Sequence, residues 1–492
     1  MKAVTVVAQY RTDPFFEKAV HLIEASGLVD RVLAVSRESA SQKLPAFCTP
    51  VDGEIHDRTT LMRIINETGT NHLLFLTGDG YVFFEPGSIE KMIAAAESTK
   101  AGIVFSDFYD LNERGKTVHP LSGYQSGSVR DDFDFGGALF FSTEAIQKAL
   151  QKYGLIPDTR YAGLYDLRLK VSIECPVHHI PEPLYSMISG KAHSGDGQLF
   201  AYVDPRNADV QKEMEIVFTD YLKKIGAYLS PGSLRQAEQT QYRFPFTATV
   251  VIPVKNRVST INGAVESALS QETDFPFNVI VVDNHSMDGT TEILSGLAKR
   301  YPTLKHIIPI STDLGIGGCW NEAINSKMCG RYAVQLDSDD LYSSTKTLQR
   351  MVDALRDGKY AMVIGSYTIV DSHLKKIKPG LVDHREWTDE NGHNNALRVN
   401  GLGAPRGFDT NIIRGIAFPN VSYGEDYAAA LRVCREYRVG RIYDSLYLCR
   451  RWEENTDAVL TIEEANRNNA FKDSIRTEEI RARQQISKGP NP

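Results

Sequence analysis

Three carboxylates stand in one short turn in the second half of the chain. Asp337, Asp339 and Asp340 directly follow the mainly apolar run 332–336, which predicts a buried strand that ends where they begin. Like charges this close destabilise one another unless a cation or hydrogen-bond donors compensate for them. Because carboxylate oxygens are preferred ligands of Mg²⁺ and Mn²⁺, the turn predicts a site for one of these ions. The alternative is a polar turn that caps the helix beginning near Ser344.

A second carboxylate turn follows the apolar run 279–282. Asp283 ends this predicted strand, and Asp288 stands where a helix is expected to begin. Asp283 is a candidate acceptor for hydrogen bonds from a nucleotide base. The alternative is a strand-end aspartate that only shapes its own turn.

Two further groups of polar residues could take part in the same chemistry. Asp426 precedes the predicted helix 428–434, where it either caps the helix or acts as a general base aimed into a cleft. Arg451 and Trp452 come after the last predicted strand, and an arginine there is suited to binding phosphates. A solvated cluster of charges is the alternative for this last group.

The segment 314–321 is rich in glycine and opens a predicted helix. Glycine allows the backbone to approach a ligand or another element closely. The segment does not follow the first strand, so it is not the dinucleotide-binding fingerprint. Asn321, at its end, is a candidate substrate-binding residue.

Alternating strands and helices must position these residues. The apolar segments 4–7 and 249–252 each open a series of such alternating patterns. The patterns are typical of an α/β fold with mostly parallel sheets flanked by helices. In such a sheet, ligands bind in the crevice at the carboxyl ends of the strands, where the aspartates stand.

The order of elements occurs twice along the chain. The matching segments are 72–79 with 332–339, 141–143 with 408–410, 169–171 with 431–433, and 184–185 with 446–447. The last two pairs share one offset, so the match exceeds a shared composition. A repeat this long predicts a duplicated domain rather than a solenoid.

The repeat predicts four segments. They are a first α/β domain at 1–190, a helical linker at 191–245, a second α/β domain at 246–457 and a helical tail at 458–492. The linker contains an apolar helical face between 207 and 229. The charged tail either docks on the core or extends from it.

The first copy lacks most of the carboxylates of the second. Asp79 stands opposite Asp339, but Thr77 stands opposite Asp337. Leu164 stands opposite Asp426. We therefore expect the first domain to be a degenerate copy that supports the second or binds an acceptor glycan, with a second, divergent active site as the alternative.

Composition excludes several classes of protein. The 492 residues predict two or three domains, and the net charge of -7 argues against a dedicated nucleic-acid binder. The six cysteines form no C-x-x-C pair. No apolar run approaches the roughly 20 residues that cross a bilayer, so we expect no transmembrane segment and a cytoplasmic protein that reaches any membrane-linked acceptor by peripheral contact. No oligomeric state follows from these features.

Taken in order, these motifs resemble the family-two glycosyltransferases, which have the GT-A fold. Segment 251–257 is similar to the family's opening strand and I-P-V-x-N-R turn, and 282–290 to its V-D-D-G-S-x-D-G-T segment. Asp337-Ser338-Asp339 matches its D-x-D motif, and 424–426 its G-E-D. The resemblance covers the second half of the chain and implies metal-dependent transfer from a nucleotide-diphosphate sugar to the hydroxyl of a glycan or lipid-linked glycan.

The resemblance also implies roles for individual residues. Asp283 would bind the nucleotide base, Asp337 the ribose or a metal-bound water, and Asp339 the Mn²⁺ or Mg²⁺ ion. Asp426 would deprotonate the acceptor in an inverting displacement. The other implied substrate-binding residues are Pro253, Asn256, Arg257, Asn321, Arg451 and Trp452.

Two positions depart from the family pattern. Asn284 stands where the family often has a second aspartate, and Trp452 stands where many relatives place a histidine metal ligand. Two alternatives remain at this stage: a retaining transferase, and a non-catalytic protein that binds sugars or nucleotides.

Overall fold

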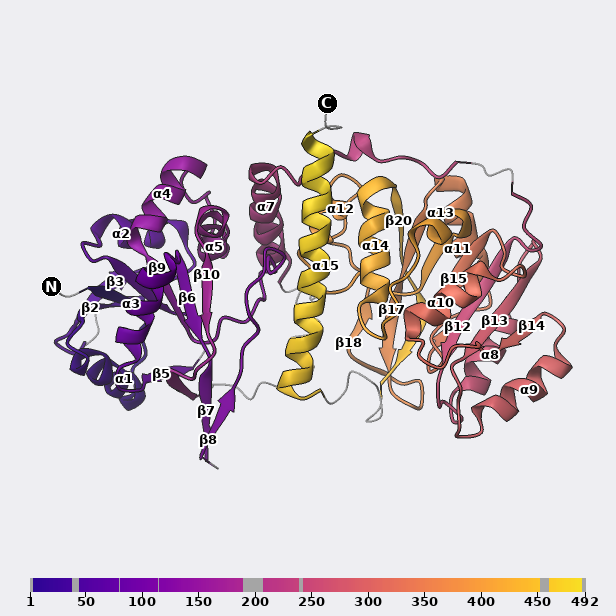
Figure 1. Cartoon of the computed structure of the whole chain (residues 1–492), viewed down its shortest axis with the longest axis horizontal. Helices are drawn as coiled ribbons and strands as arrows, with labels where there is room; N and C mark the ends of the chain where they lie inside the picture. Colours follow the sequence, from indigo (N-terminus) through magenta and orange to yellow (C-terminus); the bar gives the residue numbers. More distant parts are fainter. Residues whose placement is uncertain are drawn as a thin grey trace. The chain divides into compact units, whose positions relative to one another are not determined.

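The computed structural model describes residues 3–37, 44–78, 80–113, 115–188, 207–238, 242–451 and 460–488 (Figure 1). They form two compact units. The first contains the described residues up to 188 together with 207–228 and 461–488, and the second contains those from 229 to 460. Both units are mixed α/β, which confirms the predicted fold class.

The main sheet of the first unit has the order β10-β6-β9-β4-β1-β2-β3. Its strands are β1 (Val4–Gln9), β2 (Val29–Ser36), β3 (Cys48–Asp52), β4 (His72–Leu76), β6 (Ile103–Ser106), β9 (Ala138–Ser142) and β10 (Val177–Ile180). A smaller sheet contains β5 (Tyr81–Phe84), β11 (Tyr185–Ile188), β7 (Phe108–Asn112) and β8 (Gly115–His119). The helices are α1 (Pro14–Ala25), α2 (Arg58–Glu67), α3 (Ser88–Thr99), α4 (Thr143–Tyr153), α5 (Gly163–Glu174), α7 (Ala208–Lys224) and α15 (Ile462–Lys488).

The sheet of the second unit has the order β14-β13-β12-β15-β19-β17-β20-β16, with β18 paired to β17. Its strands are β12 (Ala248–Val254), β13 (Phe277–Asp283), β14 (Leu304–Ile307), β15 (Tyr332–Gln335), β16 (Leu341–Tyr342), β17 (Met362–Val370), β18 (Lys376–Val382), β19 (Arg406–Asp409) and β20 (Val439–Arg450). The helices are η4 (Pro231–Ser233), α8 (Ile261–Leu269), α9 (Thr290–Arg300), α10 (Ile316–Asn325), α11 (Thr347–Gly358), α12 (Gly392–Asn395), α13 (Thr410–Ile416) and α14 (Glu425–Glu436).

The two main sheets share one topology. Strands β3-β2-β1-β4-β9-β6-β10 correspond in order to β14-β13-β12-β15-β19-β17-β20. In each sheet, one strand, β9 or β19, runs antiparallel to both neighbours. The third residue of the second helix after this strand, α5 or α14, makes the same kind of contact in both units. Tyr165 donates to the carbonyl of Val129 at 2.6 Å, and Tyr427 to that of Ala396 at 2.7 Å. The structure therefore supports the duplication that the sequence predicts.

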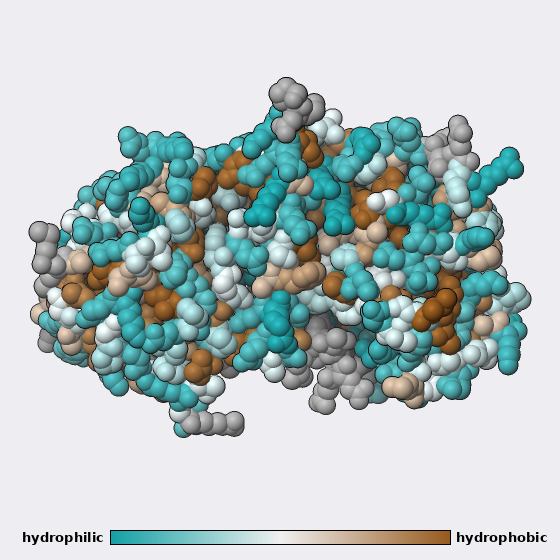
Figure 2. Space-filling model, viewed as in Figure 1, coloured by the Kyte–Doolittle hydropathy of each residue, from teal (hydrophilic) through white to brown (hydrophobic). Residues whose placement is uncertain are grey.

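Continuous apolar runs account for the central strands. Residues 279–282 of β13 and 250–252 of β12 are fully buried, as expected for parallel strands covered by helices on both faces. The surface seen in Figure 2 is mostly polar, with small separate apolar patches. Among the described residues, no helix is both long and apolar enough to cross a membrane.

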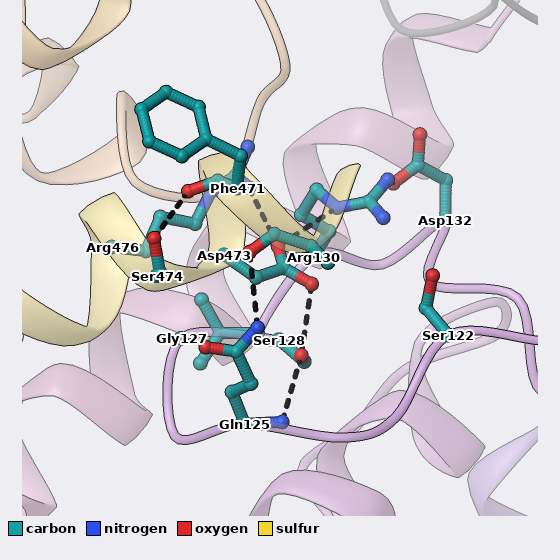
Figure 3. Close-up of polar contacts among 12 residues, drawn as sticks. Ser122, Gln125, Gly127, Ser128, Arg130, Asp132, Phe471, Asp473, Ser474 and Arg476 are labelled. Atoms are coloured by element: carbon teal, nitrogen blue, oxygen red, sulfur yellow. Dashed lines mark hydrogen bonds and ion pairs between the residues drawn. The ribbon is translucent and has the colours of Figure 1, made fainter. Parts of the chain in front are cut away.

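The helix α15 docks on the loop that precedes β9 in the first unit (Figure 3). Asp473, which is 1% exposed, accepts hydrogen bonds from Ser128 at 2.8 Å and from Nε of Arg130 at 3.4 Å. The backbone N–H of Gly127 donates to Thr477 at 2.8 Å. A Cβ at Gly127 would lie 2.0 Å from the carbonyl oxygen of Asp473, so only glycine lets the loop approach the helix this closely. The first unit is thus completed by residues from the far end of the described chain.

Candidate active site

The turns after β12 and β13 are tied together at the carboxyl end of the sheet in the second unit. Asn256 has a left-handed backbone (φ 54°), and its N–H donates to Ser286 at 2.8 Å. Its side-chain oxygen accepts from the N–H of Met287 at 2.9 Å. Asp288 accepts from the N–H of Val258 at 2.9 Å. Asn256 and Asp288 therefore hold these two turns in one arrangement.

The first turn also contacts the acidic turn after β15. Nε of Arg257 lies 3.6 Å from the carboxylate of Asp339. Thr260 donates to the carbonyl of Ser338 at 2.9 Å. Pro253 lies within β12, half-buried. Three turns from three adjacent strands thus meet at one edge of the sheet, as the sequence predicts.

Asp283 is fully buried at the end of β13. Its carboxylate accepts from Thr291 at 2.6 Å, from the N–H of Ser286 at 3.0 Å and from His306 at 3.3 Å. Burial opposes ionisation, but these hydrogen bonds outweigh it and hold the pKa of the carboxyl below its usual range. Asp283 is therefore ionised, and its carboxylate is hydrogen-bonded to residues that follow it in the chain and to His306 of β14.

The acidic turn is crowded with negative charge. Burial raises the pKa of Asp337. Burial, and then the charges of Asp337 and Asp339, raise the pKa of Asp340 well above its usual value. Asp340 accepts from the N–H of Arg450 at 2.8 Å, and Nε of Arg450 donates to the carbonyl of Asp339. Arg450 thus compensates part of the charge in the turn.

Asp426 lies at the start of α14, after Gly424 with its left-handed backbone (φ 78°). Its carboxylate lies 2.6 Å from Nη1 of Arg406, and it also accepts from the N–H of Tyr427 at 2.7 Å. The neighbouring Glu425 is buried, and burial, followed by the charge of Asp426, raises the pKa of its carboxyl to about 8. At neutral pH Glu425 is therefore mainly protonated and adds little negative charge beside Asp426.

Arg406 connects Asp426 to the acidic turn. Its Nε donates to the side-chain oxygen of Gln335 at 3.1 Å, and the side-chain nitrogen of Gln335 donates to both oxygens of Asp337 at 3.0 and 3.1 Å. The structure thus brings Asp426 and the D-x-D aspartates into one site. Sequence reasoning missed the pairing of Gln335 with Arg406, because it depends on the register of β15 against β19.

The glycines of 314–321 accommodate another part of the protein. A Cβ at Gly317 would lie 1.9 Å from the carbonyl oxygen of Pro419. The side chain of Asn321 donates to the carbonyl of Phe418 at 2.8 Å and accepts from its N–H at 3.0 Å. The oxygen and the nitrogen of the Asn321 side-chain amide therefore both hold the segment that leads into α14 and Asp426.

Replacing Gly317 with alanine is expected to displace this segment and lower catalytic activity about tenfold, because overpacking a close backbone contact costs roughly 1–3 kcal/mol. Catalytic turnover and thermal stability of the variant measure the effect. The control is Gly296→Ala in α9, where no heavy atom lies within 4 Å of the added Cβ. Equal activity of the two variants would show that the close contact at Gly317 does not position Asp426.

The other candidate positions are placed as follows. The N–H of Arg451 donates to the carbonyl of Val370 at 2.8 Å, at the end of β20. Trp452 lies outside the described residues, and so does Asp79 of the first unit. Near Leu164, the buried Asp166 forms an ion pair with Lys170 at 2.7 Å. The carboxylate two residues after Leu164 is thus neutralised within its own helix.

Comparison with known proteins identifies the second unit. Residues 249–409 match the family model described as glycosyl transferase family 2. The chain is 25% identical over 181 residues to the succinoglycan biosynthesis protein ExoA of Rhizobium meliloti, covering 33% of this chain and 53% of ExoA. It is 34% identical over 105 residues to ExoO of the same organism, covering 21% of this chain and 28% of ExoO. The chain thus spans about half the length of ExoA and less of ExoO.

A solved structure shows a more distant similarity. S. aureus TarS (residues 1–349), in complex with UDP-GlcNAc, is 20% identical with a TM-score of 0.37, covering 47% of this chain and 71% of that chain. The family match contains Asp283, the acidic turn and Arg406, and it ends before Asp426. It confirms the resemblance noted in the sequence: residues 249–409 form a glycosyltransferase family 2 domain.

Proposed function

We propose that the second unit transfers a sugar from a nucleotide-diphosphate sugar to a hydroxyl acceptor, with inversion at the anomeric carbon. The observation that carries this proposal is the polar connection from Asp426 through Arg406 and Gln335 to Asp337. It joins a carboxylate suited to accept a proton with carboxylates suited to a cation. Metal-dependent transfer with inversion uses both in one site.

In this reaction Asp426 accepts the proton of the acceptor hydroxyl while the hydroxyl oxygen attacks the anomeric carbon. The bond between that carbon and the diphosphate oxygen breaks, and the nucleoside diphosphate leaves with its electron pair. Attack from the face opposite the leaving group inverts the configuration. Arg257, whose Nε lies 3.6 Å from Asp339, would contact the phosphates.

We assign the cation to Asp337 and Asp339. Among the described residues, no three His, Cys, Asp or Glu side chains are arranged to hold a metal by themselves. The aspartates nevertheless suit a hard cation, because burial and then the charges of Asp337 and Asp339 raise the pKa of Asp340, and a cation would offset those charges. A bound Mn²⁺ or Mg²⁺ would stabilise the growing charge of the diphosphate. The diphosphate would supply the remaining oxygen ligands.

The nucleotide base is assigned to the turn that begins at Asp283, at the carboxyl end of β13. Because that carboxylate is fully buried and already accepts from three donors, direct contact with the base requires a local movement of the turn. For the acceptor, we propose a glycan or a lipid-linked glycan that enters beside residues 380–406. The proposed location is the cytoplasm, with peripheral contact where the acceptor is membrane-linked.

A thermal-shift screen with UDP-, GDP- and dTDP-sugars, each with and without Mn²⁺, tests the function. A donor at about 100 times its Kd should stabilise the folded protein by about 2.7 kcal/mol, and the shift should require Mn²⁺. Asp339→Ala should lose the Mn²⁺-dependent part, whereas Asp353→Ala in α11 should keep it. If no nucleotide sugar shifts the melting temperature and none releases nucleoside diphosphate, the proposed function is wrong.

A further inference from the structure

Gln335 and Arg406 lie side by side on the neighbouring strands β15 and β19. Gln335 is the last residue of β15, and Arg406 is the first of the antiparallel β19. Both the N–H and Nε of Arg406 donate to the side-chain oxygen of Gln335, at 3.2 and 3.1 Å. Gln335 is 5% exposed. Gln335 therefore holds Arg406 both at its backbone N–H and at its guanidinium.

The amide of Gln335 has one orientation that satisfies both of its neighbours. Its oxygen faces the donors of Arg406, and its nitrogen faces the carboxylate of Asp337. A flipped amide would set donor against donor and oxygen against carboxylate. With Nη1 of Arg406 on Asp426, the four side chains Asp426, Arg406, Gln335 and Asp337 form a continuous set of contacts, called here the polar bridge.

The first unit contains the same backbone positions without the polar bridge. In β4 and β9, Phe75 pairs in register with Leu139, at the place that Gln335 and Arg406 occupy in β15 and β19. The second residue of α5 is Leu164, as Asp426 is the second residue of α14. All three first-unit residues are buried hydrophobics.

This comparison separates the needs of the fold from those of the site. Buried polar and charged groups are costly unless they are paired, and the first unit forms the same strand pairing with apolar residues. The fold therefore does not require the polar bridge. It occurs in the copy that contains the D-x-D aspartates and Asp426.

We propose that Arg406 and Gln335 are positioning residues that hold the base Asp426 in a fixed place relative to the acidic turn. This rests on the proposed function of the second unit. Arg406 restrains one carboxylate oxygen of Asp426, and Gln335 fixes the direction of Arg406. A displacement of about 1 Å at a reacting group can cost about 100-fold in rate, so holding the base matters more to turnover than to donor binding.

The test compares Arg406→Leu, Arg406→Lys and the double variant Gln335→Phe with Arg406→Leu. The double variant copies the cross-strand pair that the first unit packs in the same register, so it keeps the strand pairing intact. Steady-state release of nucleoside diphosphate from the donor found in the screen is measured. Both leucine variants should lose about 100-fold in kcat, with the donor KM within about threefold. Lysine should recover part of kcat, because it keeps the charge but lacks the fork that reaches two partners.

The control is Arg350→Leu on the surface of α11, where Arg350 pairs with Asp444 at 2.6 Å, and its kcat should be unchanged. If the wild type turns over and folded Arg406→Leu keeps its kcat, the positioning role is wrong while the proposed function stands. A variant that loses donor affinity alone would make Arg406 a donor ligand, which also overturns the proposal. If the wild type releases no nucleoside diphosphate from any donor, the proposed function fails and the positioning role falls with it.

Discussion

Asp426→Asn is expected to lower kcat for sugar transfer by about 1000-fold, because a positioned general base contributes 10²–10⁴-fold to rate. The asparagine oxygen still accepts from Arg406 or from the N–H of Tyr427, so the start of α14 should keep its structure. The donor KM should remain within about threefold, because Asp426 acts on the acceptor. Steady-state release of nucleoside diphosphate measures both constants.

A control variant shows whether the loss of kcat is specific to Asp426. Asp353→Asn in α11 removes a carboxylate that bonds Gln349 and Arg356 and should leave kcat unchanged. The anomeric configuration of the product gives an independent readout. An Asp426→Asn variant with near-normal kcat, or a product that retains the donor's configuration, would remove Asp426 from its role as base.

Asp473→Ala is expected to destabilise the first unit by about 3 kcal/mol, since removing one partner of a buried ion pair leaves an uncompensated charge. Nη1 of Arg476, which is fully buried, lies 2.7 Å from Asp473. Arg130 and Ser128 also contact this carboxylate. Hydrogen exchange across residues 120–130 should speed up, and unfolding in urea should shift to lower concentration.

The control for this prediction lies five residues along the same helix. Glu478 is exposed, and Glu478→Ala should change stability by less than about 0.5 kcal/mol, as is usual for surface substitutions. If both variants unfold at the same urea concentration, Asp473 does not anchor α15 to the first unit.

Local patterns were enough to predict much of the fold and part of the site. The apolar strand before Asp337 is a feature of consecutive residues. The duplicated order of elements is likewise visible along the chain, and the common sheet topology supports it. Such features depend on short-range physical chemistry: a buried strand is apolar, and a turn needs polar or small residues.

Contacts between residues far apart in the chain could not be predicted from the sequence. The pairing of Gln335 with Arg406 joins residues 71 positions apart and follows only from strand register. The sequence did not show whether a ligand or another part of the protein approaches the glycine-rich segment. In the structure, the backbone of Pro419 approaches it. Whether residues 462–486 dock could not be predicted either, because α15 buries charged residues rather than a clear apolar face. Asp473 and Arg476, for example, are buried as an ion pair.

The place of α15 in the first unit has a consequence for the order in which the chain folds. The first unit takes residues from both sides of 229–460, so the second unit emerges from the ribosome before α15 does. At roughly 5–20 residues per second, synthesis of that stretch takes on the order of tens of seconds. During that time the loop around Ser128 has been made but has no helix to dock against. The second unit can therefore fold first, and the first unit closes only when α15 arrives.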